Sequence, residues 1–512
     1  MPDFVTLDAL VRQTAARTPG HIAIVDGDRQ LSYADFDCLI DGVAAALQAD
    51  GLVPRDTISI CAYSSIEYVA TFLGALRAGI AVAPLAPSST PGDFAAMLKD
   101  SGAKVLFMEA ATAASMAQAV DRAAVLRVAL DDGGWGRPFS AWCANGKKPA
   151  PVTVDPEWVF NIIYSSGTTG TPKGIVHSHG MRWRQYGQLD PLGYGPDAVT
   201  VLSTPLYSNT TLVCFNPTLA GGGTVVLMKK FDARGFLELC QTHRATHAML
   251  VPVQYRRIMA LPDFDSFDLS SFVMKLSTSA PFAATLKADV LKRWPGGLTE
   301  YYGMTEGGGT CILLAHEHPD KLHTVGCPAP DHEILLLGED GKPVVPGEIG
   351  EIFGHSPNIM QGYLNQPAKT AETFWHDASG KRYVRTGDVG RFDSDGFLTL
   401  MDRKKDMIIS GGFNIYPSDL EAVLTGHPDV LEAAVVAMPS EEWGETPVAF
   451  VVLKPNAATD AAALKRWTNE RVGKFQRLAD VHLAASLPRS AIGKVLKREL
   501  RDKQLAAQGV DI

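Results

Sequence analysis

One loop rich in glycine and hydroxyl groups constrains this chain more than any other feature. It spans residues 164–174 and reads Tyr-Ser-Ser-Gly-Thr-Thr-Gly-Thr-Pro-Lys-Gly, directly after an apolar segment that is predicted to be a buried strand. Glycines let the backbone approach a ligand closely, exposed N–H groups and hydroxyls donate to phosphate oxygens, and a lysine adds positive charge. The loop is not a Walker A motif, because two residues separate Gly170 from Lys173. The pattern therefore predicts a polyphosphate-binding loop of another kind.

The composition describes an ordinary globular protein. The chain has 512 residues, of which 46% are hydrophobic and 20% charged, enough for about three domain-sized units with ample core. The net charge of −9 argues against a general nucleic-acid binder, and seven scattered cysteines without a C-x-x-C pair favour reduced thiols over a disulfide framework. The first residues lack a basic region followed by an apolar core, and Arg77 interrupts the longest apolar stretch. We therefore expect a cytoplasmic protein without a signal peptide or an integral membrane segment.

The pattern of predicted elements changes along the chain. Up to about residue 325, strand-like and helix-like segments alternate, which predicts a mainly parallel sheet covered by helices. From about residue 325 to 401, short strands separated by Gly, Pro and Asp turns predict a β-rich subdomain. A charged run at residues 402–406 then precedes a final segment with its own βαβ pattern. We therefore expect one domain over residues 1–401 and a smaller one over residues 402–512.

Five further motifs follow the loop in a fixed order. They are Tyr-Tyr-Gly-Met-Thr-Glu at 301–306, Tyr-Val-Arg-Thr-Gly-Asp at 383–388, Asp-Arg at 402–403, Ile-Ser-Gly-Gly-Phe-Asn-Ile-Tyr-Pro at 409–417 and Pro-Arg-Ser-Ala-Ile-Gly-Lys at 488–494. With the loop, this set resembles the acyl-activating (AMP-forming) superfamily, which includes acyl-CoA and aryl-CoA synthetases, adenylation domains of peptide synthetases and beetle luciferases. The likeness covers about residues 5 to 505. It implies an α/β fold with a large N-terminal domain of stacked α/β sheets, a β-barrel-like subdomain and a small mobile α+β C-terminal domain, with the active site between the domains.

The resemblance also implies the first half-reaction and its residues. A carboxylate attacks the α-phosphate of ATP and pyrophosphate leaves, so positive charge must be concentrated where two anions approach. By resemblance, Lys494 bridges the carboxylate and the α-phosphate, which Thr305 also contacts. Glu306, with Thr168, binds Mg²⁺, and Lys173 with the loop binds the β- and γ-phosphates. The implied ATP and AMP ligands are Ser165, Ser166, Gly167, Thr168, Thr169, Gly170, Ala280, Glu300, Tyr301, Tyr302, Gly303, Asp388 and Arg403, with Tyr302 stacked on adenine and the last two residues at the ribose.

The second half-reaction needs a thiol, which in this superfamily comes from CoA or from a carrier-protein arm. The resemblance implies that the small domain rotates about a hinge at Asp402. That rotation withdraws Lys494 and brings Gly411 and Gly412 to the site, where paired glycines leave room for a slender pantetheine arm. The residues assigned to CoA are Gly411, Gly412, Trp443, Phe475 and Arg477.

The acyl pocket is where this chain departs from the superfamily. Ser208 stands where a histidine is common, and Thr278-Ser279 precede Ala-Pro where Gly-Ala or Gly-Gly is common. The implied pocket residues are Tyr207, Ser208, Asn209, Gln254, Ser279, Met304 and Gly308. They mix aromatic, small and amide groups, which suits an aryl acid or a medium-length aliphatic acid.

A histidine pair close behind the loop has the form of a metal motif. His177 and His179 form an H-x-H pair, but a third ligand does not follow nearby, so we interpret the pair as incidental to metal binding. The expected cofactors are ATP and Mg²⁺, with CoA as co-substrate.

Several functions are consistent with these motifs. The first is an acid:CoA ligase, and the second is an acyl-AMP ligase that loads a separate carrier protein. Amino-acid adenylation is disfavoured because an Asp for the α-ammonium is missing near Tyr207. A regulatory nucleotide-binding relic is disfavoured because binding alone would not need both Glu306 and Lys494, and a luciferase-like oxygenase stays a distant alternative. The expected partners are a small carboxylic acid and CoA, with no nucleic acid, and a homodimer is left open.

Overall fold

The computed structural model divides the chain into two compact units. The first unit comprises Met1–Leu322, Pro328–Glu333 and Gly354–Val384, and the second comprises His323–Cys327, Ile334–Phe353 and Arg385–Ile512. The chain therefore passes between the units several times rather than once. The hinge at Asp402 stays a prediction. The structure describes residues 3–120, 125–143, 146–165, 172–187, 192–403, 405–410, 413–489 and 494–507.

Two sheets organise the first unit. Six strands of the eight-stranded sheet, from β7 to β8, run parallel, and β9 and β19 continue it as antiparallel neighbours. The order is β19 (Gly362–Tyr363), β9 (Lys173–Ser178), β8 (Val159–Ser165), β4 (Ala81–Pro84), β3 (Thr57–Cys61), β5 (Val105–Met108), β6 (Leu126–Ala129) and β7 (Arg137–Pro138). The hydrophobic run before the glycine-rich loop is β8, as expected, and it is central because strands lie on both sides of it.

The second sheet of this unit is also parallel at its centre. Its order is β16 (Cys327–Pro328), β15 (Cys311–Leu314), β14 (Gly297–Tyr302), β13 (Met274–Ser277), β12 (His247–Leu250), β10 (Val199–Leu202), β11 (Thr224–Leu227), β1 (Ile22–Asp26) and β2 (Arg29–Ser32). In this sheet β15 pairs antiparallel with β14, and β2 pairs antiparallel with β1. The carboxyl ends of β13 and β14 lie side by side, because Ser277 pairs with Glu300. Loops that follow parallel neighbours meet at one edge, where ligands of open α/β sheets bind.

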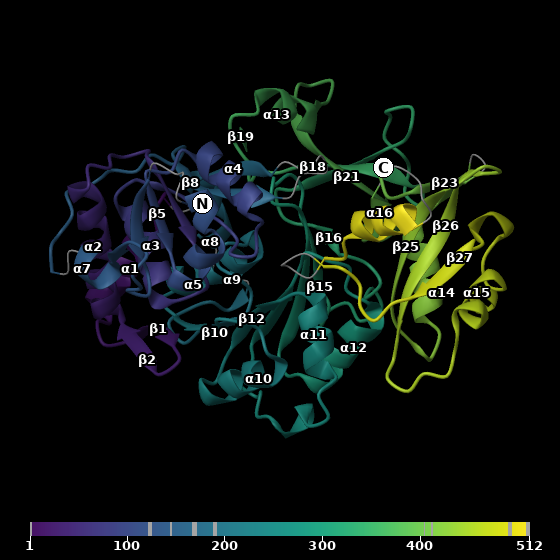
Figure 1. The fold of residues 1–512 in the computed structure, drawn as a ribbon, viewed down its shortest axis with the longest axis horizontal. Helices are drawn as coiled ribbons and strands as arrows, with labels where there is room; N and C mark the ends of the chain where they lie inside the picture. The colour runs from purple at the N-terminus through teal and green to yellow at the C-terminus, as the bar shows by residue number, and fades with distance from the viewer. Residues whose placement is uncertain are drawn as a thin grey trace. The chain divides into compact units, whose positions relative to one another are not determined.

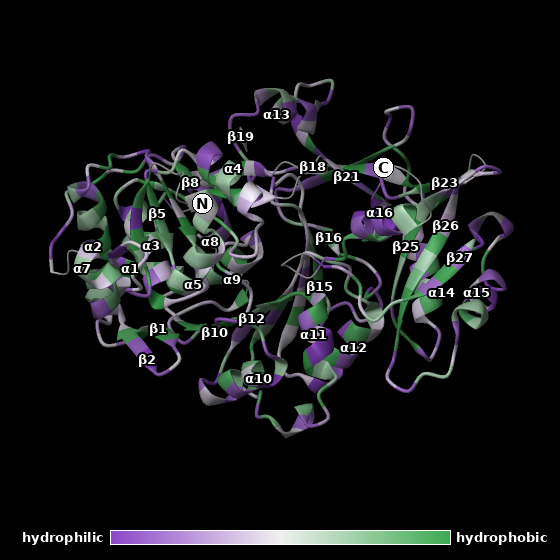
Figure 2. Cartoon of the chain, in the orientation of Figure 1, coloured by the Kyte–Doolittle hydropathy of each residue, from purple (hydrophilic) through white to green (hydrophobic). Residues whose placement is uncertain are grey.

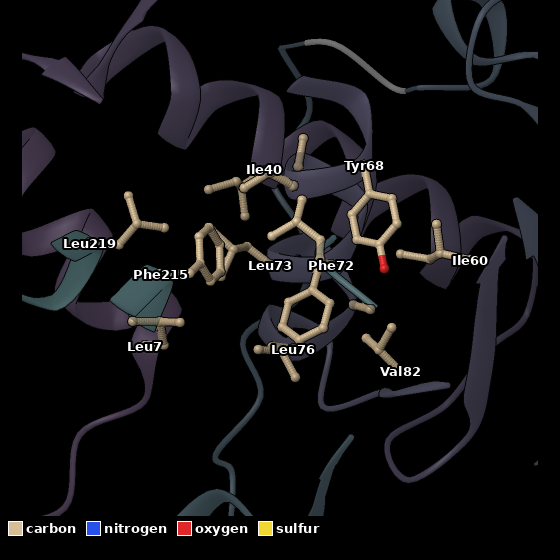
Figure 3. Packing of buried hydrophobic residues seen from close by; sticks show 14 of the residues in the cluster. Leu7, Ile40, Ile60, Tyr68, Phe72, Leu73, Leu76, Val82, Phe215 and Leu219 are labelled. Carbon is tan, nitrogen blue, oxygen red and sulfur yellow. The ribbon is translucent and has the colours of Figure 1, made fainter. Parts of the chain in front are cut away.

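Helix α3 (Ile66–Arg77) lies within the hydrophobic core of the first unit. Its N-cap Ser65 accepts a hydrogen bond from the N–H of Tyr68, and almost its whole surface is buried. A helix that is apolar all round belongs inside a core. Figure 3 shows Phe72, Leu73 and Leu76 of this helix packed among side chains from other helices and from strands β3 and β4 of the eight-stranded sheet. The neighbours labelled there are Leu7, Ile40, Ile60, Val82, Phe215 and Leu219.

The remaining helices of the first unit cover the faces and edges of the two sheets (Figure 1). Helices α2 and α3 pack against each other, as do α8 and α9. The helices are α1 (Leu7–Arg17), α2 (Tyr33–Ala49), α4 (Pro91–Ser101), α5 (Ala110–Ser115), α6 (Ala117–Val120), α7 (Phe139–Trp142), α8 (His179–Tyr186), α9 (Asn209–Ala220), α10 (Ala233–Thr242), α11 (Pro252–Met259), α12 (Ala284–Arg293) and α13 (Pro367–Thr373).

The second unit is built around two smaller sheets. In one, β21 lies between β18 and β22, and its first residues also pair with β20. In the other, β26 lies between β23 and β25 and pairs in parallel with β27. The strands of these two sheets are β17 (Glu333–Leu337), β18 (Gly350–His355), β21 (Arg382–Phe392), β22 (Leu398–Arg403), β23 (Ile408–Ser410), β24 (Phe413–Ile415), β25 (Val430–Ser440), β26 (Gly444–Leu453) and β27 (Asp480–Leu483), together with β20 (Phe374–His376), whose residues belong to the first unit. The helices of the second unit are α14 (Pro417–Thr425), α15 (Ala461–Asn469) and α16 (Lys497–Ala507).

The hydropathy of the strands and helices agrees with their burial. Figure 2 shows the strands of the first unit mostly in the hydrophobic colour and α16 mostly in the hydrophilic colour. Helix α16 nevertheless buries Leu500 and Leu505, which join an apolar cluster with residues of β25 and β26. The basic tail is thus a polar helix anchored by two leucines. In the described part of the chain, every helix is too short or too polar to cross a bilayer. The expected α/β architecture is confirmed.

Candidate functional site

The β8–β9 hairpin fixes both ends of the glycine-rich loop. Ser165 and Lys173 face each other as the last pair of this antiparallel ladder. Ser166, Gly167, Thr168, Thr169 and Gly170 lie outside the described residues, so their phosphate contacts stay predictions. Lys173 is half-buried, and its ammonium Nζ lies 4.9 Å from the centroid of the Tyr363 ring.

Glu306 contacts the hydroxyl of the same tyrosine. The Tyr363 hydroxyl donates a hydrogen bond of 2.8 Å to Glu306 Oε1, and burial raises the pKa of Tyr363, which keeps that hydroxyl protonated. The N–H of Met360 donates to the carbonyl of Glu306 at 2.9 Å. The next residue must be glycine, since Gly307 has a φ of +80° and a Cβ there would lie 1.9 Å from the carbonyl oxygen of Asn358.

The structure therefore brings the two predicted residues Lys173 and Glu306 to one aromatic ring. Sequence reasoning missed Tyr363, which lies 57 positions from Glu306. A Gly-Tyr pair at 362–363 carries no spacing signal of its own, and only the pairing of β19 with β9 brings it here. Among the described residues, no group of three or more His, Cys, Asp or Glu side chains forms a metal cluster.

The residues expected near the nucleotide base follow β13 and β14. The Thr278 hydroxyl donates to the carbonyl of Tyr301 at 2.9 Å, which ties the two strand ends together. Glu300 is almost fully buried and forms an ion pair with Lys287 of α12, a partner that sequence reasoning did not identify. Burial raises the pKa of Glu300 to about 7, and the lysine opposes that shift. Tyr302 is buried at the end of β14. Near them Ala280 and Tyr301 are half-buried, and Gly303 is exposed.

Hydrogen bonds through Thr210 connect the two unusual residues of the predicted acyl pocket, Ser208 and Ser279. Ser208 is the N-cap of α9 and accepts a hydrogen bond from the N–H of Thr210. The Thr210 and Ser279 hydroxyls lie 2.8 Å apart. Ser279 has a φ of +81°, a conformation that costs a non-glycine residue about 1–3 kcal/mol. Asn209 at the start of α9 has a buried side-chain oxygen with no hydrogen-bond partner in the described part of the chain.

The other predicted pocket residues have varied surroundings. Gln254 is buried in α11, where its amide oxygen accepts from the N–H of Val251 at 3.0 Å, so it caps the helix. Burial raises the pKa of Tyr207, whose neighbours include Ser88. Met304 is half-buried, whereas Gly308 is buried with a φ of +84°. The structure thus links Ser208 with Ser279 through Thr210 but gives Gln254 a structural hydrogen bond.

Three predicted residues lie together in the second unit. Asp388 and Arg403 are paired across β21 and β22, with Arg403 Nε 3.2 Å from Asp388 Oδ1. Lys494 lies close enough to be influenced by both. Burial, followed by the charge of Arg403, lowers the pKa of Lys494 to about 8, and Asp388 opposes this shift. The motifs at 383–388, 402–403 and 488–494 therefore contribute to one cluster.

The residues predicted for CoA are described only in part. Gly411, Gly412 and the side chain of Phe475 lie outside what the structure describes, as does the side chain of the predicted hinge residue Asp402. Trp443 is 37% exposed and precedes Gly444, which pairs with Ser410 at the end of β23. Trp443 thus lies beside the strand that leads into residues 411–412. Arg477 follows a short 3₁₀ turn, Lys474–Gln476, and is exposed.

Comparison with known proteins agrees with this geometry. Residues 11–364 match the family described as AMP-binding enzyme, and residues 419–494 match the AMP-binding enzyme C-terminal domain. The chain is 34% identical to indoleacetate–CoA ligase of Aromatoleum aromaticum, with 98% of each chain covered, and 34% identical to feruloyl-CoA synthase of an Amycolatopsis species, with 95% of this chain and 96% of the relative covered. The crystal structure of ATP-bound MatB from Rhodopseudomonas palustris superimposes with a TM-score of 0.88 at 28% identity, covering 98% of this chain and 99% of that one. The chain belongs to the family of AMP-binding enzymes.

Proposed function

We propose that this chain is an ATP-dependent acid:CoA ligase whose substrate is an aromatic carboxylic acid. It activates the acid as an acyl-AMP with release of pyrophosphate and then forms the acyl-CoA thioester. The observation that supports this most is that Lys173 lies over the ring of Tyr363 while Glu306 accepts a hydrogen bond from its hydroxyl, close to the end of the glycine-rich loop. A cation for phosphate and a carboxylate for a metal are the two groups that a bound nucleoside triphosphate needs.

The residues present fit a Mg²⁺ ion that arrives with ATP. Mg²⁺ keeps several waters and is usually bound through one or two protein carboxylates plus substrate phosphates. Glu306 offers one carboxylate, oriented by Tyr363, and Thr168 is proposed as the second protein ligand. When bound, the ion neutralises charge on the phosphate oxygens during pyrophosphate departure.

The protein's own residues then divide the work of the two half-reactions. In the first, a carboxylate oxygen of the acid forms a bond to the α-phosphorus and the bond to pyrophosphate breaks. We propose that Lys494 and Thr305 stabilise the negative charge that develops on the α-phosphate and the attacking carboxylate. Asp388 and Arg403 are assigned to the ribose hydroxyls. In the second, the CoA sulfur forms a bond to the acyl carbon and AMP leaves, with Trp443 and residues 411–412 assigned to CoA.

The aromatic substrate is supported by the pocket and by the relatives. Ser208 and Ser279 are small, and the unpartnered oxygen of Asn209 offers an acceptor for a polar group on the acid. The two relatives described above act on aromatic acids, as their names state. The alternative substrate is a medium-length aliphatic acid, and a panel of aryl and aliphatic acids distinguishes the two classes. A cytoplasmic location, in keeping with seven free cysteines, and a homodimer are part of the proposal.

The test is pyrophosphate release from ATP across a panel of aryl and aliphatic acids, with and without CoA. We expect release that depends on an arylalkanoic or arylacrylic acid, and acyl-CoA as the product by mass spectrometry. Turnover that proceeds without CoA and yields no acyl-CoA would overturn the ligase assignment and favour a carrier-protein acceptor. Preference for an aliphatic acid would overturn only the substrate class.

A further inference from the structure

Arg182 is a buried cation without a carboxylate partner. It lies in α8, its side chain is fully buried, and no ion pair links it to a carboxylate among the residues that the structure describes. Its guanidinium donates to the amide oxygen of Asn161 at 3.2 and 3.3 Å and to Gln185 Oε1 at 2.8 Å. Burial lowers the pKa of Arg182 to about 9. An apolar residue of similar size would avoid this desolvation cost, so packing alone does not account for an arginine here.

The third acceptor of Arg182 is a histidine ring. Arg182 Nη2 lies 2.8 Å from Nδ1 of His177, which is also fully buried. A guanidinium has donors only, so Nδ1 must accept and the ring proton must reside on Nε2. That Nε2–H points at the carbonyl oxygen of Thr305, 2.7 Å away. Arg182 therefore selects the one neutral tautomer of His177 that can donate to Thr305.

This hydrogen-bonded chain joins the two segments of the proposed phosphate and metal site. His177 and Lys173 lie on β9, four positions apart, and so project from the same side of the strand. Thr305 and Glu306 lie in the turn after β14, more than a hundred positions later in the chain. The bond from His177 to Thr305 is thus a direct polar tie between the strand that leaves the glycine-rich loop and the turn that carries the metal carboxylate.

We propose that His177, oriented by Arg182, is a positioning residue that fixes the carbonyl of Thr305 and thereby places Glu306 for the adenylation half-reaction. The proposal rests on the proposed function for its catalytic readout. Removing the Nε2–H frees the Thr305 carbonyl, and Glu306 moves with it. Adenylation depends on that geometry because pyrophosphate leaves only in this half-reaction, whereas thioester formation from acyl-AMP does not involve the β- and γ-phosphates.

The first test compares three substitutions of His177. His177→Leu and His177→Asn remove the donor at the Nε2 position, and His177→Gln restores an amide N–H at a similar reach. We expect the Leu and Asn variants to lose roughly 10- to 100-fold in pyrophosphate formation, the range typical when the supporting partner of a metal ligand is removed. Thioester formation from preformed acyl-AMP should change by less than about threefold, and His177→Gln should recover most of the adenylation rate.

A binding measurement keeps the test independent of the acid. By calorimetry, the affinity of the Leu and Asn variants for Mg·ATP should fall roughly tenfold, while their affinity for ATP in EDTA stays within about twofold of the wild type. His247→Leu is the matched control, because His247 is also fully buried and donates from Nε2 to a backbone carbonyl, that of Leu192, at 2.8 Å. The His247→Leu substitution should lower the stability of the fold without a selective loss of affinity for Mg·ATP over ATP in EDTA.

A double substitution tests the role of Arg182. If Arg182 acts through His177, Arg182→Met combined with His177→Leu should slow adenylation no more than His177→Leu alone. Effects that multiply would show that Arg182 acts separately and would overturn the linked arrangement. Equal loss of both half-reactions, a His177→Gln variant as slow as His177→Leu, or unchanged Mg·ATP affinity in folded variants would overturn the positioning role. Failure of the wild type to release pyrophosphate with any acid would instead refute the proposed function, and the Mg·ATP measurement would still decide the role of His177.

Discussion

Arg403 and Asp388 face each other across strands β21 and β22, with 3.2 Å between Nε and a carboxylate oxygen. Lys494 is influenced by both charges, which act in opposite directions on its pKa. One acidic and two basic groups are therefore gathered in a small region of the second unit. The carboxylate orients the arginine and offsets part of the repulsion between the two cations.

Replacement of Lys494 by alanine should separate the two half-reactions. We expect adenylation to fall by at least about 100-fold, because a preorganised cation on a developing negative charge contributes on this scale. Thioester formation from preformed acyl-AMP should stay within about threefold of the wild type, since the cation is assigned to the first half-reaction only. Pyrophosphate formation and acyl-CoA formation, measured separately, check this. Equal loss of both would contradict the assignment and the predicted hinge motion at Asp402.

Adenylation should also decline in alkaline solution. Burial lowers the pKa of Lys494 to about 8, and only the protonated form can neutralise the phosphate, so the active fraction falls as pH rises through this value. We expect kcat/KM for ATP in pyrophosphate release to fall about tenfold for each pH unit above that point. In Lys494→Arg the charge persists at high pH, so whatever activity remains should lose this alkaline limb. An alkaline limb that is identical in both enzymes would show that another group titrates.

The buried pair of Lys287 and Glu300 should make stability depend on pH in a variant. Lys287→Met leaves Glu300 buried without its cation, which typically costs about 3–5 kcal/mol of unfolding free energy. The folded-state pKa of Glu300 is raised to about 7 already with the lysine present. The unfolded glutamate ionises near its ordinary value, so the folded state binds more protons and the loss of stability should grow as pH rises from about 4.5 towards 8.

Urea unfolding at pH 5 and pH 8 measures this difference. Adding Glu300→Gln to Lys287→Met should remove most of the pH dependence, because the buried group no longer ionises. A destabilisation of the same size at both pH values would show that lost packing, rather than the unpaired charge, causes the effect.

Ser279→Gly should widen the range of acids with little effect on stability. Glycine relieves the backbone strain at a φ of +81° but gives up the hydrogen bond to Thr210, and these effects are each on the order of 1 kcal/mol and opposite in sign. We expect kcat/KM to rise for acids with bulkier rings and to change little for the best small acid. Thr210→Val is the control, since it removes the hydrogen bond and leaves the serine side chain in place. Unchanged selectivity in Ser279→Gly would show that residue 279 does not line the acyl pocket.

Motif order predicted which segments carry the candidate residues, because motifs encode local backbone. The glycine-rich loop, the turn at 301–306 and the Thr-Gly-Asp segment each depend on small residues at fixed spacing. The structure places Lys173 at the start of β9, Glu306 after β14 and Asp388 within β21, and the roles of these residues stay predictions. Sheet order could not be derived in the same way. Tyr363 reaches Glu306 only because β19 pairs with β9, a contact that no local spacing encodes.

The partners of buried polar residues were the second feature that the sequence did not predict. Glu300 was expected near the adenine, and that role stays a prediction, but its position within an otherwise apolar strand already indicates a buried partner. Lys287 is the partner, and its place on α12 follows from helix packing rather than from any motif. His177 was interpreted as incidental to metal binding, and the structure gives both of its ring nitrogens protein partners instead.

The interleaved path of the chain has a consequence for its synthesis. The first unit needs Gly354–Val384, which supplies Tyr363, yet the ribosome makes two segments of the second unit before that stretch appears. Domains usually fold in the order in which they emerge. Here the leading 322 residues must wait for a late segment, while the early pieces of the second unit stay exposed until Arg385–Ile512 arrives. Expression of residues 1–381 alone would therefore release β18 without β21, the neighbouring strand of its sheet.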